Sequence, residues 1–168
     1  MAKTLIAFYS RAGQNYGASG IENLAKGNTE VAADMIQEIT GADMFKIETV
    51  QEYPEDYTKC TEVAKKELQA NARPEMKGLP GNFEDYDTII LGYPNWWSHM
   101  PMVVYNFLES LNFDGKTILP FCTHGGGGLS GTEKEIKRIC PGAEVKGGLA
   151  INGAGVHGAK KSIENWLK

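Results

Sequence analysis

One stretch decides how this chain folds: residues 89–99, which read Ile-Ile-Leu-Gly-Tyr-Pro-Asn-Trp-Trp-Ser-His. Its first half is apolar and β-branched and ends at Gly92, a pattern typical of a strand that is buried on both faces. Its second half is a loop containing Pro94, which fixes one backbone angle and removes a hydrogen-bond donor. The sequence therefore predicts that two adjacent indoles, Trp96 and Trp97, follow the carboxyl end of a buried strand.

The position of these indoles allows two interpretations. Loops at the carboxyl edge of a parallel sheet are where open α/β proteins bind ligands, so Trp96 and Trp97 can form a stacking surface for a planar, aromatic and partly apolar molecule. In the other interpretation both indoles are ordinary packing residues. This stretch alone supports the two interpretations equally, and the rest of the chain has to decide between them.

Length and composition narrow the class of protein. The chain has 168 residues, which fits one domain spanning residues 1–168, and its 42% hydrophobic and 23% charged residues are typical of a globular fold. Its net charge of −4 and isoelectric point near 5.4 argue against a nucleic-acid partner, which needs a basic face. The same charge permits docking to a basic protein but is too small to establish it.

The sequence also lacks the marks of a membrane or secreted protein. No apolar run approaches the roughly 20 residues that a membrane helix needs, and the first residues carry no secretory signal pattern. The three cysteines, Cys60, Cys122 and Cys140, are far apart and form no Cys-x-x-Cys pair. We interpret them as reduced thiols and expect a cytoplasmic protein.

Five apolar or alternating segments are predicted as strands, at residues 3–9, 44–48, 87–92, 116–121 and 144–151. Helical patterns separate them, beginning at Asn28 and Pro101 and covering, for the others, roughly residues 55–71, 131–139 and 156–168. Residues 10–27 are rich in glycine and polar side chains and are expected to form a long loop. This alternation predicts an α/β fold with a parallel sheet and helices on both faces.

The long loop ends at the start of a helix, where backbone N–H groups and the helix dipole favour an anion. Ser10 and Arg11 precede the loop, and Asn28 and Thr29, either of which can cap the helix, follow it. The alternative is a capped helix that binds nothing. The Gly-x-x-x-x-Gly-Lys-Ser/Thr motif does not occur, so the loop is not that of a nucleotide-triphosphate hydrolase.

Other catalytic and cofactor motifs are weak or missing. Residues 126–131 and 153–158 both match Gly-x-Gly-x-x-Gly, but neither lies on the first strand, and the second is better explained as a tight turn into the last helix. His99, His124 and His157 have no metal-ligand spacing, so no metal site is expected. No Gly-x-Ser-x-Gly elbow is present, which leaves serine acyl transfer unsupported.

Three loops, which follow the first, third and fourth predicted strands, together resemble those of the flavodoxin family, over essentially the whole chain. Residues 8–11 with 27–29 look like the two ends of the phosphate loop, residues 92–97 like the loop that covers the isoalloxazine ring, and residues 121–126 like a third loop in contact with the ring. The resemblance implies a three-layer sandwich with a five-stranded parallel sheet in the order 2-1-3-4-5. It also implies FMN as a noncovalent cofactor.

The phosphate loop departs from the compact family pattern Ser/Thr-x-Thr-Gly-x-Thr, because residues 12–27 intervene, as in a subgroup with a split loop. This insertion leaves room for Tyr16 to approach the flavin. Carried over residue by residue, the resemblance implies no catalytic residue, no metal ligand and a cofactor site made of Ser10, Arg11, Asn15, Tyr16, Asn28, Thr29, Pro94, Asn95, Trp96, Trp97, Thr123, His124, Gly125 and Gly126.

Family resemblance also implies a function. A flavodoxin is a low-potential one-electron carrier between redox proteins, so the expected partners are a reductase and an acceptor, and the expected state is a monomer that contacts neither nucleic acid nor membrane. A flavin-dependent NAD(P)H or quinone reductase on the same fold is the alternative. It needs an open ring face, which two bulky indoles make less accessible.

Overall fold

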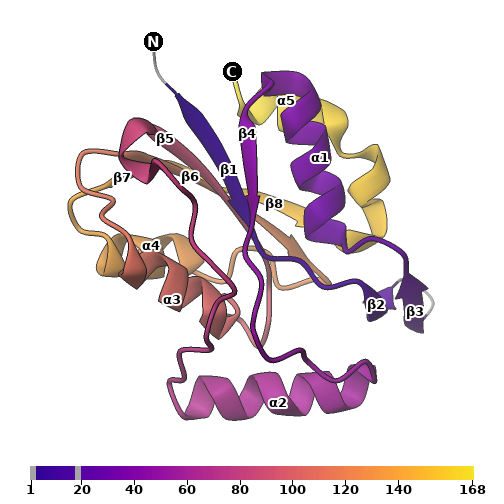
Figure 1. Ribbon diagram of the computed structural model, residues 1–168. Coiled ribbons are helices and arrows are strands. Elements are labelled where there is room, and N and C mark those ends of the chain that lie inside the picture. Colours follow the sequence, from indigo (N-terminus) through magenta and orange to yellow (C-terminus); the bar gives the residue numbers. More distant parts are fainter. Residues whose placement is uncertain (1–2, 18–19) are drawn as a thin grey trace.

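The predicted central strand is present in the computed structural model, which describes residues 3–17 and 20–168 (Figure 1). It forms β5 (Thr88–Pro94) and lies between β1 (Thr4–Phe8) and β6 (Thr117–His124), parallel to both. Ile89 and Leu91 are fully buried. Because apolar side chains cover both faces of β5, polar groups that could bind a ligand are confined to the loop at its carboxyl end.

Strand order confirms the predicted topology. The sheet runs β4 (Asp43–Lys46), β1, β5, β6, followed by β7 (Glu144–Val145) and β8 (Leu149–Asn152), which both pair with β6. Since β7 and β8 are two pieces of the fifth strand, this is the order 2-1-3-4-5.

The single strand expected at residues 144–151 is therefore broken. Pro120 of β6 has no N–H to donate at the break, and the Gly148 N–H donates to Glu133 Oε2 at 2.6 Å. Gly147 and Gly148 also bring no side chains to pack on the sheet.

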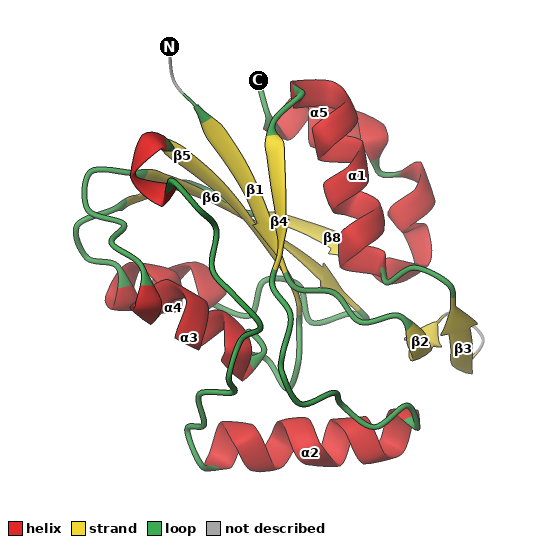
Figure 2. Ribbon diagram, in the orientation of Figure 1, coloured by secondary structure: helices red, strands yellow, loops and turns green. Residues whose placement is uncertain are grey.

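Helices cover both faces of the sheet, as predicted (Figure 2). One face carries α1 (Asn28–Thr40) and α5 (Lys160–Trp166), and the other carries α3 (Met102–Ser110) and α4 (Thr132–Ile139). The remaining helix, α2 (Tyr57–Gln69), lies beyond the carboxyl ends of the strands, where it contacts α3 and β2 (Figure 1). Two short 3₁₀ helices, η1 (Phe83–Asp85) and η2 (Gly153–Gly158), complete the fold.

Alternating side chains of the strands fill two cores. Leu5 and Ala7 of β1 belong to the core beneath α3 and α4, whereas Ile6 and Phe8 belong to the core beneath α1 and α5. This period of two follows from the pleat of a strand.

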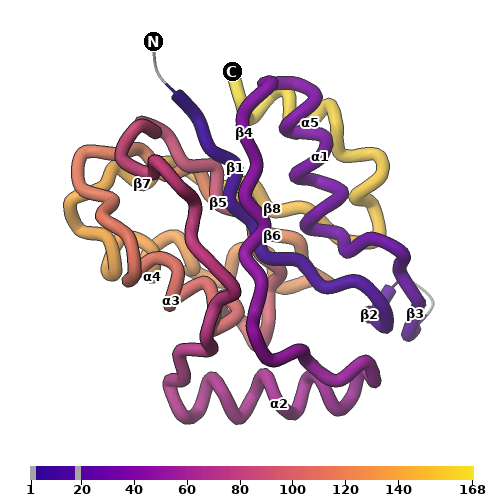
Figure 3. Tube along the Cα trace, viewed as in Figure 1, coloured from indigo at the N-terminus to yellow at the C-terminus, as the bar shows by residue number. Residues whose placement is uncertain are grey.

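Two sequence predictions need correction. Residues 10–27 do not form a plain loop: they contain an antiparallel hairpin of β2 (Gly13–Gly17) and β3 (Gly20–Leu24), and residues 18 and 19 lie outside the described residues (Figure 3). Glycine permits the φ of +81° at Gly13 and +104° at Gly20. The closing helix expected at residues 156–168 is instead η2 followed by α5, because glycines at 153, 155 and 158 disfavour an α-helix.

None of the helices within the described residues is both long and apolar enough to cross a membrane.

Stability of the fold depends on β5. We expect Leu91→Ala to lower the free energy of unfolding by about 2–5 kcal/mol, because Leu91 is fully buried and the cavity left behind cannot close completely. Leu79→Ala is the matched control: Leu79 is 45% exposed, so its loss should stay within about 0.5 kcal/mol. Urea unfolding followed by circular dichroism measures both, and equal effects would contradict the assignment of β5 as the buried centre.

Candidate functional site

A cavity of about 770 Å³ opens at the carboxyl edge of the sheet, lined by the ends of β1, β5 and β6, the start of α1, the hairpin, α2 and the start of η2. Every residue of the predicted cofactor site except Gly126 lines it. Gly126 instead lies in the loop after β6, where its N–H donates to His124 Nδ1 at 2.9 Å. The tertiary structure thus brings together residues from three loops that are far apart in sequence.

One end of the cavity is the amino terminus of α1. The N–H groups of Asn28 and Thr29 donate to no partner within the described residues, as is usual for the first turn of a helix. Ser10 rather than Asn28 or Thr29 caps the helix, because its Oγ accepts from the Glu30 N–H at 3.1 Å. The buried Thr29 and Thr123 hydroxyls lie 2.6 Å apart and join α1 to β6. These neutral donors suit an anion.

The same end has a second wall that the sequence reading did not assign to the site. Asn152, Gly153 and Ala154 line the cavity, and the Ala154 N–H donates to Asn152 Oδ1 at 3.0 Å. A side chain at Gly153 would place its Cβ 2.5 Å from Asn28 Nδ2, so any larger residue here has to displace the Asn28 amide. The Gly-x-Gly pattern after a strand was the available signal, but the sequence favoured a tight turn into the last helix at this position.

The two indoles have different surroundings, which separates the two interpretations of the sequence. Trp96 is partly buried and packs edge-on against Tyr9 and Tyr53, with ring centroids 5.5 and 5.1 Å away. Trp97 is 47% exposed, and its Nε1 donates to the Thr61 carbonyl of α2 at 2.9 Å. Trp96 is therefore a packing residue that also lines the cavity, whereas Trp97 stands at the mouth.

A tight turn holds Trp97 in this place. Trp96 and His99 exchange backbone hydrogen bonds of 2.9 and 3.0 Å across a two-residue turn, with φ of +55° at Trp97 and +65° at Ser98. Left-handed conformations are costly for such residues and persist where surrounding contacts enforce them. Asn95 supplies one such contact, because its Oδ1 accepts from the Ser98 N–H while its Nδ2 donates to Gly128 O in the next loop.

α2 and the hairpin form the outer wall of the cavity, and the sequence did not predict this part. Tyr57, Cys60, Thr61 and Ala64 line the cavity from α2. The pattern of α2 is that of any amphipathic helix, and nothing local says that it packs past the edge of the sheet instead of on its face.

Behind Trp96 the wall is a cluster of buried titratable groups. The Tyr53 hydroxyl donates to Glu67 Oε1 at 2.5 Å. Burial raises the pKa values of the Tyr9 and Tyr53 phenols well above their usual range, and it also raises the pKa of the Cys60 thiol. Burial likewise raises the pKa of Glu67, against the opposing effect of the Tyr53 hydrogen bond. Burial therefore favours the uncharged forms of all four groups behind Trp96.

No cluster of three or more His, Cys, Asp or Glu side chains with the arrangement of a metal site is found among residues 3–17 and 20–168.

Comparison with known proteins identifies the family. The flavodoxin family model matches residues 3–168. The chain belongs to the flavodoxin family. A search of curated protein sequences found no match.

Solved structures of the flavodoxin fold agree with this assignment. Two provisionally assigned flavoproteins, from Bacteroides uniformis ATCC 8492 and Bacteroides eggerthii DSM 20697, share 29% and 26% identity, with TM-scores of 0.80 and 0.78. Each match covers 99% of this chain and 97% and 96% of the other. A flavoprotein from Lactobacillus acidophilus NCFM, crystallised in complex with FMN, has a TM-score of 0.70 at 20% identity, covering all of both chains, and shows the fold alone.

The raised pKa of Glu67 predicts a pH dependence of stability. The folded state holds the proton to higher pH than the unfolded chain, so this carboxyl costs stability as pH rises from about 4.5 through its raised pKa. Glu67→Gln removes the cost and keeps an acceptor for Tyr53. We expect the variant to gain stability relative to the natural protein between pH 4 and pH 8, measured by urea unfolding.

Glu62→Gln, on the exposed side of the same helix, is the control and should show no such trend. A difference for Glu67→Gln that stays constant with pH, or has the opposite sign, would overturn the role of burial.

Proposed function

We propose that this protein binds FMN noncovalently and serves as a low-potential one-electron carrier between redox proteins. The observation that carries the proposal is that the two ends of the cavity differ. At the start of α1, neutral N–H and O–H groups can donate hydrogen bonds to an anion, and at the other end Trp96 and Trp97 form an aromatic wall. A flavin mononucleotide has the same division, with an anionic tail and a planar apolar ring. Membership of the flavodoxin family supports the same cofactor.

The residues at each end have distinct tasks in this proposal. Ser10, Asn28 and Thr29, with the η2 segment around Gly153, would hold the phosphate through neutral donors and the α1 dipole. Pro94, Trp97 and the loop after β6 would border the ring. When bound, FMN supplies the redox chemistry that the protein's own side chains lack.

The surroundings favour a low potential. Apolar walls and a net charge of −4 both disfavour additional negative charge in the cavity. A carrier of this kind docks transiently to a reductase and an acceptor. We propose such proteins as partners, with the chain acting as a monomer away from nucleic acid and membrane.

Titration with FMN tests the proposal. We expect the apoprotein to become yellow and to quench tryptophan fluorescence at micromolar FMN. Trp97→Ala should weaken binding by about tenfold, the equivalent of about 1.4 kcal/mol, because it removes aromatic contact and opens the mouth to water. It should also raise the potential of the second one-electron step, because water stabilises the added charge.

Trp166→Phe on α5, outside the cavity, controls for the loss of an indole. Failure of the natural protein to take up FMN would sink the proposal.

A second function, an FMN-dependent NAD(P)H or quinone reductase, is favoured by one observation: Tyr16 and Trp97 at the mouth are 63% and 47% exposed, so the cavity opens to solvent. Stopped-flow mixing of the FMN-loaded protein with NADPH and a quinone distinguishes the two functions. For a carrier we expect slow bleaching without sustained turnover. Rapid bleaching followed by many turnovers would establish the reductase and displace the carrier.

A further inference from the structure

The side chain of Arg11 bridges two segments that are far apart in the sequence. Its Nη1 donates to the Gln14 carbonyl at the hairpin, and its Nη2 donates to the carbonyls of Pro54 and Glu55 at 2.9 and 2.8 Å. Arg11 is half-buried, and both Nη2 hydrogens are used in these contacts. The Arg11 guanidinium therefore binds backbone carbonyls of the segment just before α2.

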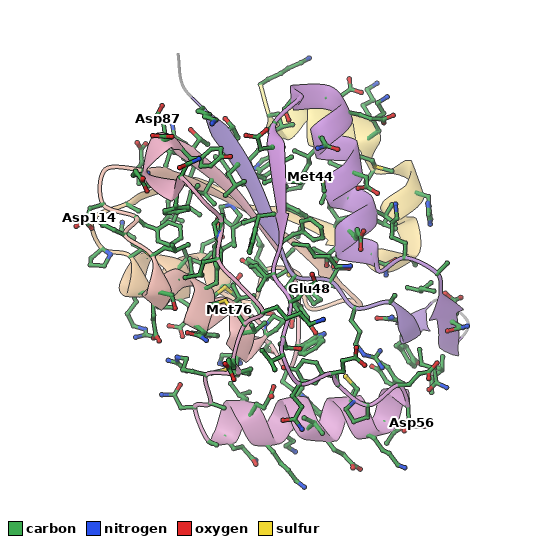
Figure 4. The ribbon with its side chains drawn as sticks, viewed as in Figure 1. Met44, Glu48, Asp56, Met76, Asp87 and Asp114 are labelled. Atoms are coloured by element: carbon green, nitrogen blue, oxygen red, sulfur yellow. The ribbon has the colours of Figure 1, made fainter. Side chains whose placement is uncertain are left out.

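A second link joins the same two segments. Gln14 Oε1 accepts from the Tyr57 N–H at 2.8 Å, and the rings of Tyr16 and Tyr57 lie 6.0 Å apart at a tilt of 35°. Asp56, at the amino end of α2 (Figure 4), caps the helix by accepting from the Lys59 N–H at 2.9 Å. The hairpin and the start of α2 thus form one unit, which we call the cover: residues 13–17, 20–24 and 54–64.

The cover forms the outer wall of the cavity through Tyr16, Gly17, Tyr57, Cys60, Thr61 and Ala64. α2 lies beyond the sheet edge and has few contacts with the sheet core, which it reaches through Leu68 near its far end. Arg11 and Gln14 hold residues 54–57 at the start of α2, and Trp97 Nε1 adds a hydrogen bond to the Thr61 carbonyl one turn further along the helix. At the opposite end of the cavity, neutral N–H and O–H groups at the start of α1 can already donate hydrogen bonds to an anion.

We propose that Arg11 is a positioning residue that fixes the cover over the cofactor cavity, and that it does not hold the cofactor's phosphate. The inference rests on the proposed FMN binding and refines which residues act on which part of the cofactor. It reassigns the positive charge that the sequence places next to the anion site. A guanidinium suits this task because its planar fork reaches several carbonyls at once, which a lysine ammonium cannot do in the same geometry.

Paired titrations with FMN and riboflavin, which lacks the phosphate, test the proposal. We expect Arg11→Gln to weaken binding of both ligands by the same factor, about tenfold, because hydrogen bonds from a charged group are lost and the cover loosens. Arg11→Lys should lose nearly as much, since it keeps the charge but not the fork.

Two further variants calibrate the experiment. Gly153→Ala crowds Asn28 at the phosphate end and should weaken FMN much more than riboflavin. Arg73 also donates to backbone carbonyls, those of Asn71 and Ala72, but it does not line the cavity. Arg73→Gln should therefore leave the affinities for FMN and for riboflavin unchanged. If Arg11→Gln weakens only FMN, or if Arg11→Lys restores FMN affinity, Arg11 is a phosphate ligand and the proposal fails.

Amide hydrogen exchange of the apoprotein tests the same contact without any flavin. In Arg11→Gln, amides of the hairpin and of residues 57–60 should exchange at least about tenfold faster, while those of β1, β5 and β6 keep their protection. Unchanged protection of the cover would overturn the proposal. If the natural protein binds neither flavin, the proposed function fails, and hydrogen exchange still decides whether Arg11 holds the cover.

Discussion

The parallel pairing of β5 with β1 and β6 is the constraint on which the rest of the structure depends. A strand in this position is covered on both faces, so its side chains must be apolar until the sheet ends. The amide of Asn95 and the indoles of Trp96 and Trp97 therefore lie in the loop after Pro94, beyond the end of the strand. Because the strands of the central sheet are all parallel, the corresponding loops of β1 and β6 reach the same edge, and one cavity forms where they meet.

Secondary structure forms the polar end of the cavity, and loops form its aromatic end. The start of α1 provides backbone donors whose positions are fixed by the helix, which suits an anionic group without requiring a cationic side chain. At the aromatic end, the Asn95 amide joins the loops after β5 and β6 by donating to Gly128 O and Ser130 Oγ. The family assignment and the shape of the cavity therefore point to the same cofactor.

Local patterns were sufficient where one physical effect dominates. The run of β-branched residues in β5 and the helical spacing in α1 and α3 were read correctly, because burial of apolar surface decides both. Loop residues such as Ser10 and Thr123 were grouped correctly at one edge, because the topology requires it. Their contacts with a ligand stay a prediction. The hairpin at residues 13–24 was missed because its strands are short, polar and rich in glycine.

Apolar periodicity and the order of strands and helices were enough to predict a parallel sheet with helices on both faces and loops at its carboxyl edge, since these follow from burial and chain connectivity. The strand order and the set of cofactor-site residues came from the resemblance to the flavodoxin family. Side-chain direction was not accessible in the same way. Three features depend on contacts between segments more than 30 residues apart. Trp96 packs in the interior while Trp97 lies at the mouth of the cavity, Arg11 points toward Pro54 and Glu55, and α2 lies past the sheet edge. Such contacts have no local signature, because the partners of each group are chosen by the three-dimensional packing of the whole chain.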